Sequence, residues 1–171
     1  WKFDKISLPI LKISPTTMIK EIKISSIKSR RHVKFKAKKY KTNTIIGFNE
    51  YRSKFITKIE ECLIIDSKLQ RFIHDIEKPL HKLLGKGDEI DVHANLLDNG
   101  IDLLISGIDK IDYHKLNIFV DALSKSSVIR FHRKLKDNTN ELLFSTDLSS
   151  LSNKSFSYIT FPPPGGFLQA T

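Results

Sequence analysis

The sequence is poor in cysteine, glycine and proline, and it lacks any long apolar run. Its 171 residues include one Cys, seven Gly and six Pro. A single Cys excludes an internal disulfide and is typical of a reducing compartment, so we expect a cytoplasmic protein. No apolar run approaches the roughly 18 residues of a membrane-spanning helix, so no membrane partner is expected. No glycine-rich segment has the spacing of a phosphate-binding loop either.

Carboxylates are absent from residues 28–41, a stretch that holds eight Lys or Arg residues. Residues 1–42 carry a net charge of +11 and the remaining 129 residues a net charge of −1. The whole formal charge of +10 therefore lies in the first quarter of the chain. Such a concentrated positive field favours a polyanionic partner, because each neutralised phosphate releases counterions. The charge pattern predicts binding to nucleic acid or another polyanion.

Apolar residues and lysines alternate within 33–38, with the period of two of a half-buried strand. The lysines of such a strand would line one face at a spacing of about 6–7 Å, near the phosphate spacing of a single nucleic-acid strand. The guanidinium groups just before the strand could bind phosphates through two hydrogen bonds or stack on bases. The alternative is a solvated edge strand whose lysines prevent edge-to-edge pairing. The predicted RNA contacts in this block are Arg30, Arg31, Lys34, Lys36, Lys38 and Lys39.

Helical spacing of apolar residues predicts two main helices, over 69–84 and 112–125, and a shorter one over 2–12. Asp66 or Ser67 can cap the first main helix, and Pro79 should bend it. Turn residues between alternating segments predict three hairpins, and 54–60 reads as a further extended stretch. The hairpins join 32–40 to 44–49, 89–97 to 101–107, and 128–134 to 141–146. The sum is an α+β fold: an antiparallel sheet built from hairpins, with the two main helices on one face.

The last part of the chain reads as the start of another unit. Residues 147–155 are rich in Ser and are expected to be a linker, and 156–161 form an apolar strand that runs into three prolines. Gly165 and Gly166 are expected to complete a rigid turn. The chain opens with Trp1 rather than Met, and together these features predict a piece of a longer protein.

The ending Phe161-Pro-Pro-Pro-Gly-Gly-Phe-Leu-Gln-Ala-Thr171 resembles the start of the catalytic domain of bacterial RNA uracil-5 methyltransferases, of the 23S ribosomal RNA type. In that family a Phe-x-Gln follows a short strand just before the S-adenosylmethionine-binding fold. Further segments agree with the family in order and spacing. They are Trp1-Lys2, Ser29-Arg-Arg-His-Val-Lys-Phe35, Ile46-Gly-Phe48 with Ser53 and Ile56, Glu61-Cys-Leu-Ile-Ile65, and Asp98-Asn-Gly-Ile-Asp-Leu-Leu104.

The resemblance implies a metal role for Cys62, at the position of the fourth ligand of a [4Fe–4S] cluster. Leu63 departs from the family pattern, which usually has Pro there. Such a cluster takes four thiolates, so this chain alone is expected to hold no cofactor. Without the resemblance, a lone Cys is more often a small buried hydrophobe. His74 and His81 complete no zinc spacing and are expected to be structural or surface residues.

The resemblance also implies chemistry that this chain does not complete. In the family, a Cys attacks C6 of uracil, C5 receives the methyl group, and a carboxylate removes the C5 proton. The target base must first leave its stack. Gln169 corresponds to a residue of the cofactor pocket, and Phe167 to an aromatic beside the base, although Phe167 could equally be a core residue. Since no second Cys, matched base or cofactor loop is present, no residue here is expected to be catalytic.

The resemblance thus predicts a central RNA-recognition domain over 1–155 and the truncated beginning of a methyltransferase domain over 156–171. The longer protein would bind S-adenosylmethionine and a [4Fe–4S] cluster, and it would act on ribosomal or transfer RNA. The alternative is a free-standing RNA-binding module without catalysis, or the product of a split gene.

Overall fold

The computed structural model describes residues 2–19, 25–108, 110–146, 153–155, 158–160 and 162–166. Its helices are α1 (Lys2–Ile13), α2 (Ser67–Asp75), α3 (Glu77–Leu83) and α4 (Tyr113–Ser124). Its strands are β1 (His32–Lys39), β2 (Thr44–Asn49), β3 (Ile56–Lys58), β4 (Glu89–Leu96), β5 (Ile101–Ser106), β6 (Val128–Lys134), β7 (Asn140–Ser145), β8 (Asn153–Ser155) and β9 (Tyr158–Thr160).

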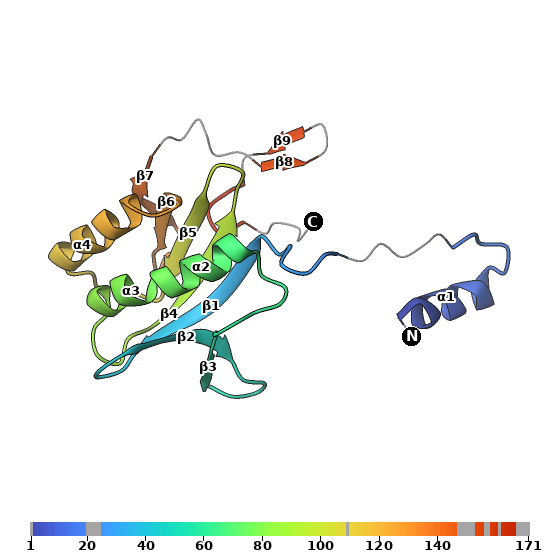
Figure 1. Ribbon diagram of the computed structural model, residues 1–171, viewed down its shortest axis with the longest axis horizontal. Coiled ribbons are helices and arrows are strands. Elements are labelled where there is room, and N and C mark those ends of the chain that lie inside the picture. The colour runs from blue at the N-terminus through green and yellow to red at the C-terminus, as the bar shows by residue number, and fades with distance from the viewer. Residues whose placement is uncertain are drawn as a thin grey trace.

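Seven strands form one sheet in the order β3-β2-β1-β4-β5-β6-β7, and α2, α3 and α4 cover one of its faces (Figure 1). The three predicted hairpins are confirmed as the antiparallel pairs β1–β2, β4–β5 and β6–β7. β1 also pairs with β4, so a strand from the first hairpin lies beside one from the second. The only parallel pair in this sheet is β5–β6, because α4 carries the chain back across the sheet between them. The α+β class is confirmed.

The first main helix is divided in two at Ile76, where α2 ends and α3 begins. Asp66 caps α2, because its Oδ1 atom accepts a hydrogen bond from the Lys68 amide at 2.8 Å. Pro79 lies in the first turn of α3 and has no amide hydrogen to donate to the carbonyl of Asp75. The helix is therefore broken into two rather than bent, and the break lies three residues before the proline. The second main helix is confirmed as α4, capped by Asp112.

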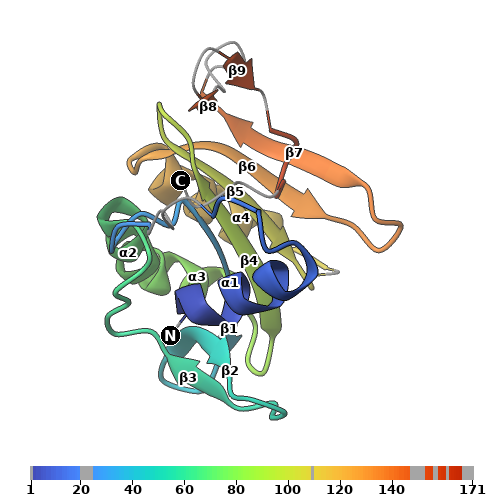
Figure 2. The same cartoon turned by 90° about the vertical axis from the view of Figure 1, so that its right-hand side faces the viewer.

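The hydrophobic core lies between the sheet and these three helices. Alternate residues of β1, β4 and β5 point into it, and Phe119 of α4 packs edge-on against Phe131 of β6 with ring centroids 5.4 Å apart. The opposite face of the sheet, here called the open face, is turned toward the viewer in Figure 2. It carries polar side chains of the same strands. Its residues include His32, Lys34, Lys36, Lys38, Glu89, Asp91, His93, Asn95, Asp102, Arg130 and His132.

The predicted helix near the start of the chain is confirmed as α1, which continues through Pro9 and stands apart from the sheet (Figure 1). Its apolar side chains are largely exposed, as at Ile6 and Leu8. None of the described helices is long and apolar enough to cross a membrane.

The expectation of a linker over 147–155 is wrong for its last three residues. Residues 153–155 form β8, which pairs with β9 in a separate two-stranded sheet. The remainder, 147–152, lies outside the described residues. β8 and β9 pair across the predicted domain boundary at residue 155, and that boundary stays a prediction.

Candidate nucleic-acid interface

The lysines of β1 lie beside carboxylates of β4, although the basic block itself contains none. The register places Lys36 opposite Asp91 and Lys38 opposite Glu89. Lys36 Nζ lies 3.0 Å from Glu89 Oε1 and 3.3 Å from Asp91 Oδ1, and Lys38 Nζ lies 3.0 Å from Glu89 Oε2. The sequence alone does not reveal these pairs, because β4 follows β1 by about fifty residues.

These ion pairs shift the pKa values of Glu89 and Lys36 in the directions expected for opposite charges. The hydrogen bond from Lys36, helped by the one from Lys38, lowers the pKa of Glu89. The hydrogen bond to Glu89 raises the pKa of Lys36, and partial burial opposes it. All these groups are about one-third exposed, with side-chain accessibilities of 28–32%, so each pair contributes modestly. The two lysines are thus partly neutralised and less available to phosphates than the sequence predicted.

Two other predicted RNA contacts hold the fold together. Arg31 donates from Nε to the Leu96 carbonyl and from Nη2 to Asp98, both at 2.9 Å. Lys39 Nζ donates to the carbonyls of His81 at 2.6 Å and Leu84 at 2.8 Å. The ammonium group therefore satisfies carbonyls at the end of α3, where a positive charge is favoured.

Arg30 and Lys34 are the exposed members of the predicted set. They line a hollow of about 340 Å³ together with Cys62 and Phe48. Residues 28–30 run beside 63–66, since the amides of Lys28 and Arg30 donate to the carbonyls of residues 63 and 64 at 2.8 Å. This pairing brings the basic block next to Cys62, more than thirty residues along the chain.

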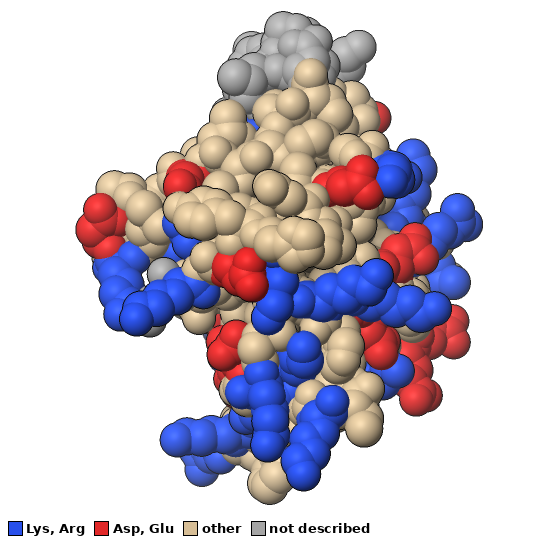
Figure 3. Space-filling view, turned by 90° about the vertical axis from the view of Figure 1, so that its left-hand side faces the viewer, with Lys and Arg blue, Asp and Glu red and all other residues tan. Residues whose placement is uncertain are grey.

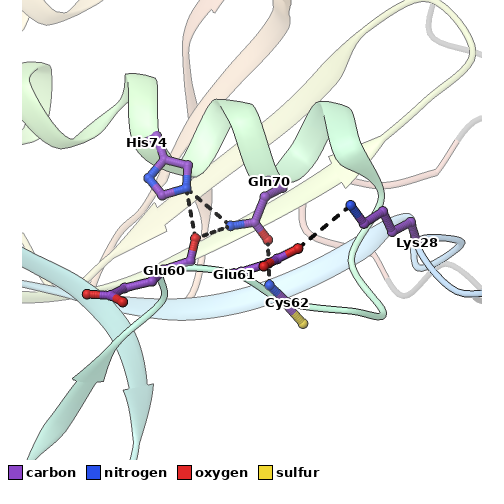
Figure 4. Close-up of polar contacts among 6 residues, drawn as sticks. All are labelled: Lys28, Glu60, Glu61, Cys62, Gln70 and His74. Carbon is purple, nitrogen blue, oxygen red and sulfur yellow. Dashed lines mark hydrogen bonds and ion pairs between the residues drawn. The ribbon is translucent and has the colours of Figure 1, made fainter.

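Cys62 is a partly buried free thiol that packs against the core. Its amide donates to Gln70 Oε1 at 3.1 Å, and the Gln70 amide nitrogen donates to the Glu60 carbonyl at 3.1 Å. Figure 4 shows these contacts holding the loop against α2, with the sulfur pointing away from them. Within the described residues no group of three or more His, Cys, Asp or Glu could hold a metal ion. Since a [4Fe–4S] cluster takes four thiolates, the residues present do not fit one on their own.

The two histidines expected to be structural each form a local hydrogen bond. His74 Nε2 lies 3.1 Å from the Glu60 carbonyl, beside Gln70. His81 Nδ1 lies 3.0 Å from Thr44 Oγ1 and so joins α3 to β2. His74 is exposed and His81 is half-buried, and both lie in the helices that cover one face of the sheet.

The open face of the sheet holds the segment 162–166 by its backbone. Arg130 Nη2 donates to the Pro162 carbonyl at 2.9 Å, and Asn95 Nδ2 donates to the Gly166 carbonyl at 2.8 Å. Arg130 Nε also donates to the buried Asp102 at 2.7 Å. Gly165 has a φ of +67°, and a Cβ atom there would lie 2.4 Å from the Leu104 side chain. The expected rigid turn is confirmed, and a glycine is required within it.

Several polar groups of this open face are buried. Asp102 Oδ2 and His132 Nδ1 find no hydrogen-bond partner within the part of the chain that the structure describes. Burial, followed by the charge of Arg130, lowers the pKa of His132. Burial, followed by the charge of Lys34, lowers the pKa of His93. Both imidazoles are therefore held toward the neutral form.

Phe167 and Gln169, predicted to lie beside a base and a cofactor, fall outside the described residues. Asn95 and Arg130, which hold the segment just before Phe167, were not predicted from the sequence. A signal was present for Asp102, the partner of Arg130, because it is a carboxylate within the otherwise apolar segment 101–105.

No protein-family model matches the chain. Three curated proteins are similar to it, and each is named an uncharacterized RNA methyltransferase. Those of Brucella suis and Brucella melitensis are 25% identical over 144 residues, which cover 84% of this chain and 33% of each relative. That of Rhizobium meliloti is 22% identical over 142 residues, or 83% of this chain and 32% of the relative. The chain thus spans about a third of the length of proteins named as RNA methyltransferases.

Proposed function

We propose that this chain is the RNA-contacting part of a longer S-adenosylmethionine-dependent RNA methyltransferase and does not catalyse methyl transfer alone. The observation that carries the proposal is the similarity of 84% of the chain to one-third of proteins named as RNA methyltransferases. The concentrated basic charge of residues 1–42 supports RNA as the partner. The finer proposal is a uracil-5 enzyme acting on ribosomal or transfer RNA, with Gln169 and Phe167 at its cofactor and base pocket.

The proposal is tested by comparing the 171-residue chain with the protein encoded by its complete reading frame. Each is incubated with transcribed ribosomal and transfer RNA and S-adenosylmethionine carrying a labelled methyl group. We expect label in RNA only with the complete protein, and 5-methyluridine on nuclease digestion. The chain alone should bind RNA with an affinity that falls steeply with salt. Label transferred by the chain alone would contradict the non-catalytic assignment, and a complete protein that leaves RNA unlabelled would overturn the methyltransferase.

We also propose that Cys62 supplies one of four thiolates of a [4Fe–4S] cluster in that longer protein. Supporting this proposal, the thiol borders the hollow of about 340 Å³ beside Arg30 and Lys34.

The cluster proposal is tested by anaerobic reconstitution, iron counting and visible absorbance. The 171-residue chain should bind no iron, since it has a single Cys. In the complete protein, Cys62→Ser should lose or destabilise the cluster, because one iron is left without its thiolate. A Ser variant that keeps all of its iron would return Cys62 to the role of a core residue.

A further inference from the structure

Four exposed lysines gather at the end of the molecule where α3 meets two turns. They are Lys41 in the β1–β2 turn, Lys78 and Lys82 in α3, and Lys86 in the turn before β4. We call this surface the basic end. Figure 3 shows Lys and Arg side chains gathered over the lower half of this side of the molecule.

Hydrogen bonds fix the three elements of the basic end to one another. Lys39 Nζ binds two carbonyls of the α3 terminus, and the Lys39 carbonyl accepts from the Gly87 amide at 3.0 Å. Thr44 in β2 is joined to His81 in α3 at 3.0 Å. Lys78 and Lys82 are four residues apart and so lie on the same side of their helix. The four ammonium groups are therefore carried by a rigid base, although their side chains are free to adapt.

The lysines of the basic end are not neutralised as those of β1 are. Within the described ranges, none of the four forms an ion pair with a carboxylate, whereas Lys36 and Lys38 both do. Two acids close to these lysines in the chain already have partners. Glu77 pairs with Lys58 at 3.5 Å, and Asp88 accepts a hydrogen bond from the Gly85 amide at 2.7 Å. Among the described residues the four lysines therefore lack a direct carboxylate partner, and their charge is less neutralised than that of Lys36 and Lys38.

The basic end also has a shape that suits a nucleic-acid backbone. Lys78 and Lys82 border a hollow of about 270 Å³ whose other walls include Thr42, Asn43 and His81, together with Glu77, whose carboxylate pairs with Lys58. Hydroxyl, amide and imidazole groups can donate to phosphate oxygens or bind a ribose hydroxyl. Cations around a polar hollow are typical of phosphate contacts that position an RNA strand without reading its sequence.

We propose that the basic end is the principal RNA-docking surface of this chain, ahead of the β1 lysines. This inference rests on RNA being the partner in the proposed function. It places the larger part of the phosphate contacts on α3 and the adjoining turns, and it assigns the β1 lysines mainly to cross-strand pairing.

The test compares two variants that lose the same charge. In the first, Lys41, Lys78, Lys82 and Lys86 are all replaced by Gln. The control replaces Lys28, Lys36, Lys38 and Lys125 by Gln, all of which are ion-paired in the structure. Binding of a fluorescein-labelled 20-nucleotide oligouridylate is measured by anisotropy across a salt series. Circular dichroism and thermal melts verify that both variants remain folded.

We expect the basic-end variant to bind more weakly and to lose about 0.7 of the salt slope for each phosphate contact removed. The control should keep most of the wild-type slope. Equal losses in the two variants would show that only net charge matters and would overturn the inference, while leaving RNA binding itself intact. A loss confined to the control would assign the contacts to the ion-paired lysines and would overturn the inference. If the wild-type chain binds no RNA at all, this inference is overturned. The methyltransferase proposal is tested separately, by methyl transfer with the complete protein.

Discussion

The lysines of β1 and those of the basic end have the same chemistry but different neighbours. On β1, antiparallel pairing with β4 brings Glu89 and Asp91 to within 3.0–3.9 Å of three successive outward lysines. At the basic end the chain turns, so no adjacent strand supplies carboxylates in register. A lysine count in the sequence therefore overstates the charge that β1 offers to a partner, because a sheet neutralises charge across strands. Positive charge remains available where the backbone leaves the sheet.

The largest effect is expected at the most deeply buried ion pair of the open face, between Arg130 and Asp102. Their side chains are 9% and 0% exposed. Arg130→Ala should destabilise the protein by about 3–5 kcal/mol, because it leaves a buried carboxylate without its partner. Urea unfolding followed by circular dichroism measures the loss. The double variant Arg130→Met with Asp102→Leu should recover most of it, since no buried charge remains. A single variant as stable as wild type would contradict the role of this pair.

Removing the acids of β4 should erase the difference between the β1 lysines and those of the basic end. Glu89→Gln combined with Asp91→Asn should release Lys36 and Lys38 and make β1 resemble the basic end. We expect tighter binding to oligouridylate, with a salt slope steeper by up to about 0.7 for each new phosphate contact. Stability should fall by up to about 1 kcal/mol for each exposed pair lost.

Asp121→Asn is a control for the β4 variant, because Asp121 pairs with Lys125 at the end of α4 and not with a strand lysine. It removes an acid without freeing a strand lysine, so its salt slope should stay close to the wild-type value. A slope left unchanged in the β4 variant as well would mean that the β1 lysines do not reach RNA even when free.

The smallest effect is a pH dependence that reports the Glu89 pairs. Because Lys36 and Lys38 lower the pKa of Glu89 in the folded state, its contribution is present above the ordinary Glu pKa. That contribution is lost as the pH falls through the lowered value. The difference in unfolding free energy between wild type and Glu89→Gln should therefore shrink toward zero in acid. Urea melts over a pH series measure it, and a difference that grows as the pH falls would contradict the assignment.

The sequence predicted local structure well wherever the residues that determine it are adjacent in the chain. The three hairpins, α1, α4 and the Asp66 cap all follow from residues adjacent in the chain. Pro79 marked the disturbed helix, although the break lies three residues earlier because the missing hydrogen bond is to the preceding turn. The parallel pairing of β5 with β6 was not predicted, since it depends on where α4 packs.

The candidate site was less predictable, because its residues come from segments that lie far apart in the chain. The basic block was identified from residues 28–41, but its partners come from β4 and from the end of α3. Cys62 was singled out by resemblance, and only the pairing of 28–30 with 63–66 places it beside Arg30 and Lys34. The support of 162–166 by Asn95 and Arg130 joins residues up to seventy-one positions apart.

The charge segregation, the hairpins, the helices and the α+β class follow from the sequence, because each depends on the period and chemistry of neighbouring residues. Which lysines are neutralised depends on the tertiary structure. The strand register sets Lys36 and Lys38 against Glu89 and Asp91, whereas the packing of α3 against the turns leaves Lys41, Lys78, Lys82 and Lys86 facing solvent. Ion pairing acts over a few ångströms in space, and distance along the chain does not report it.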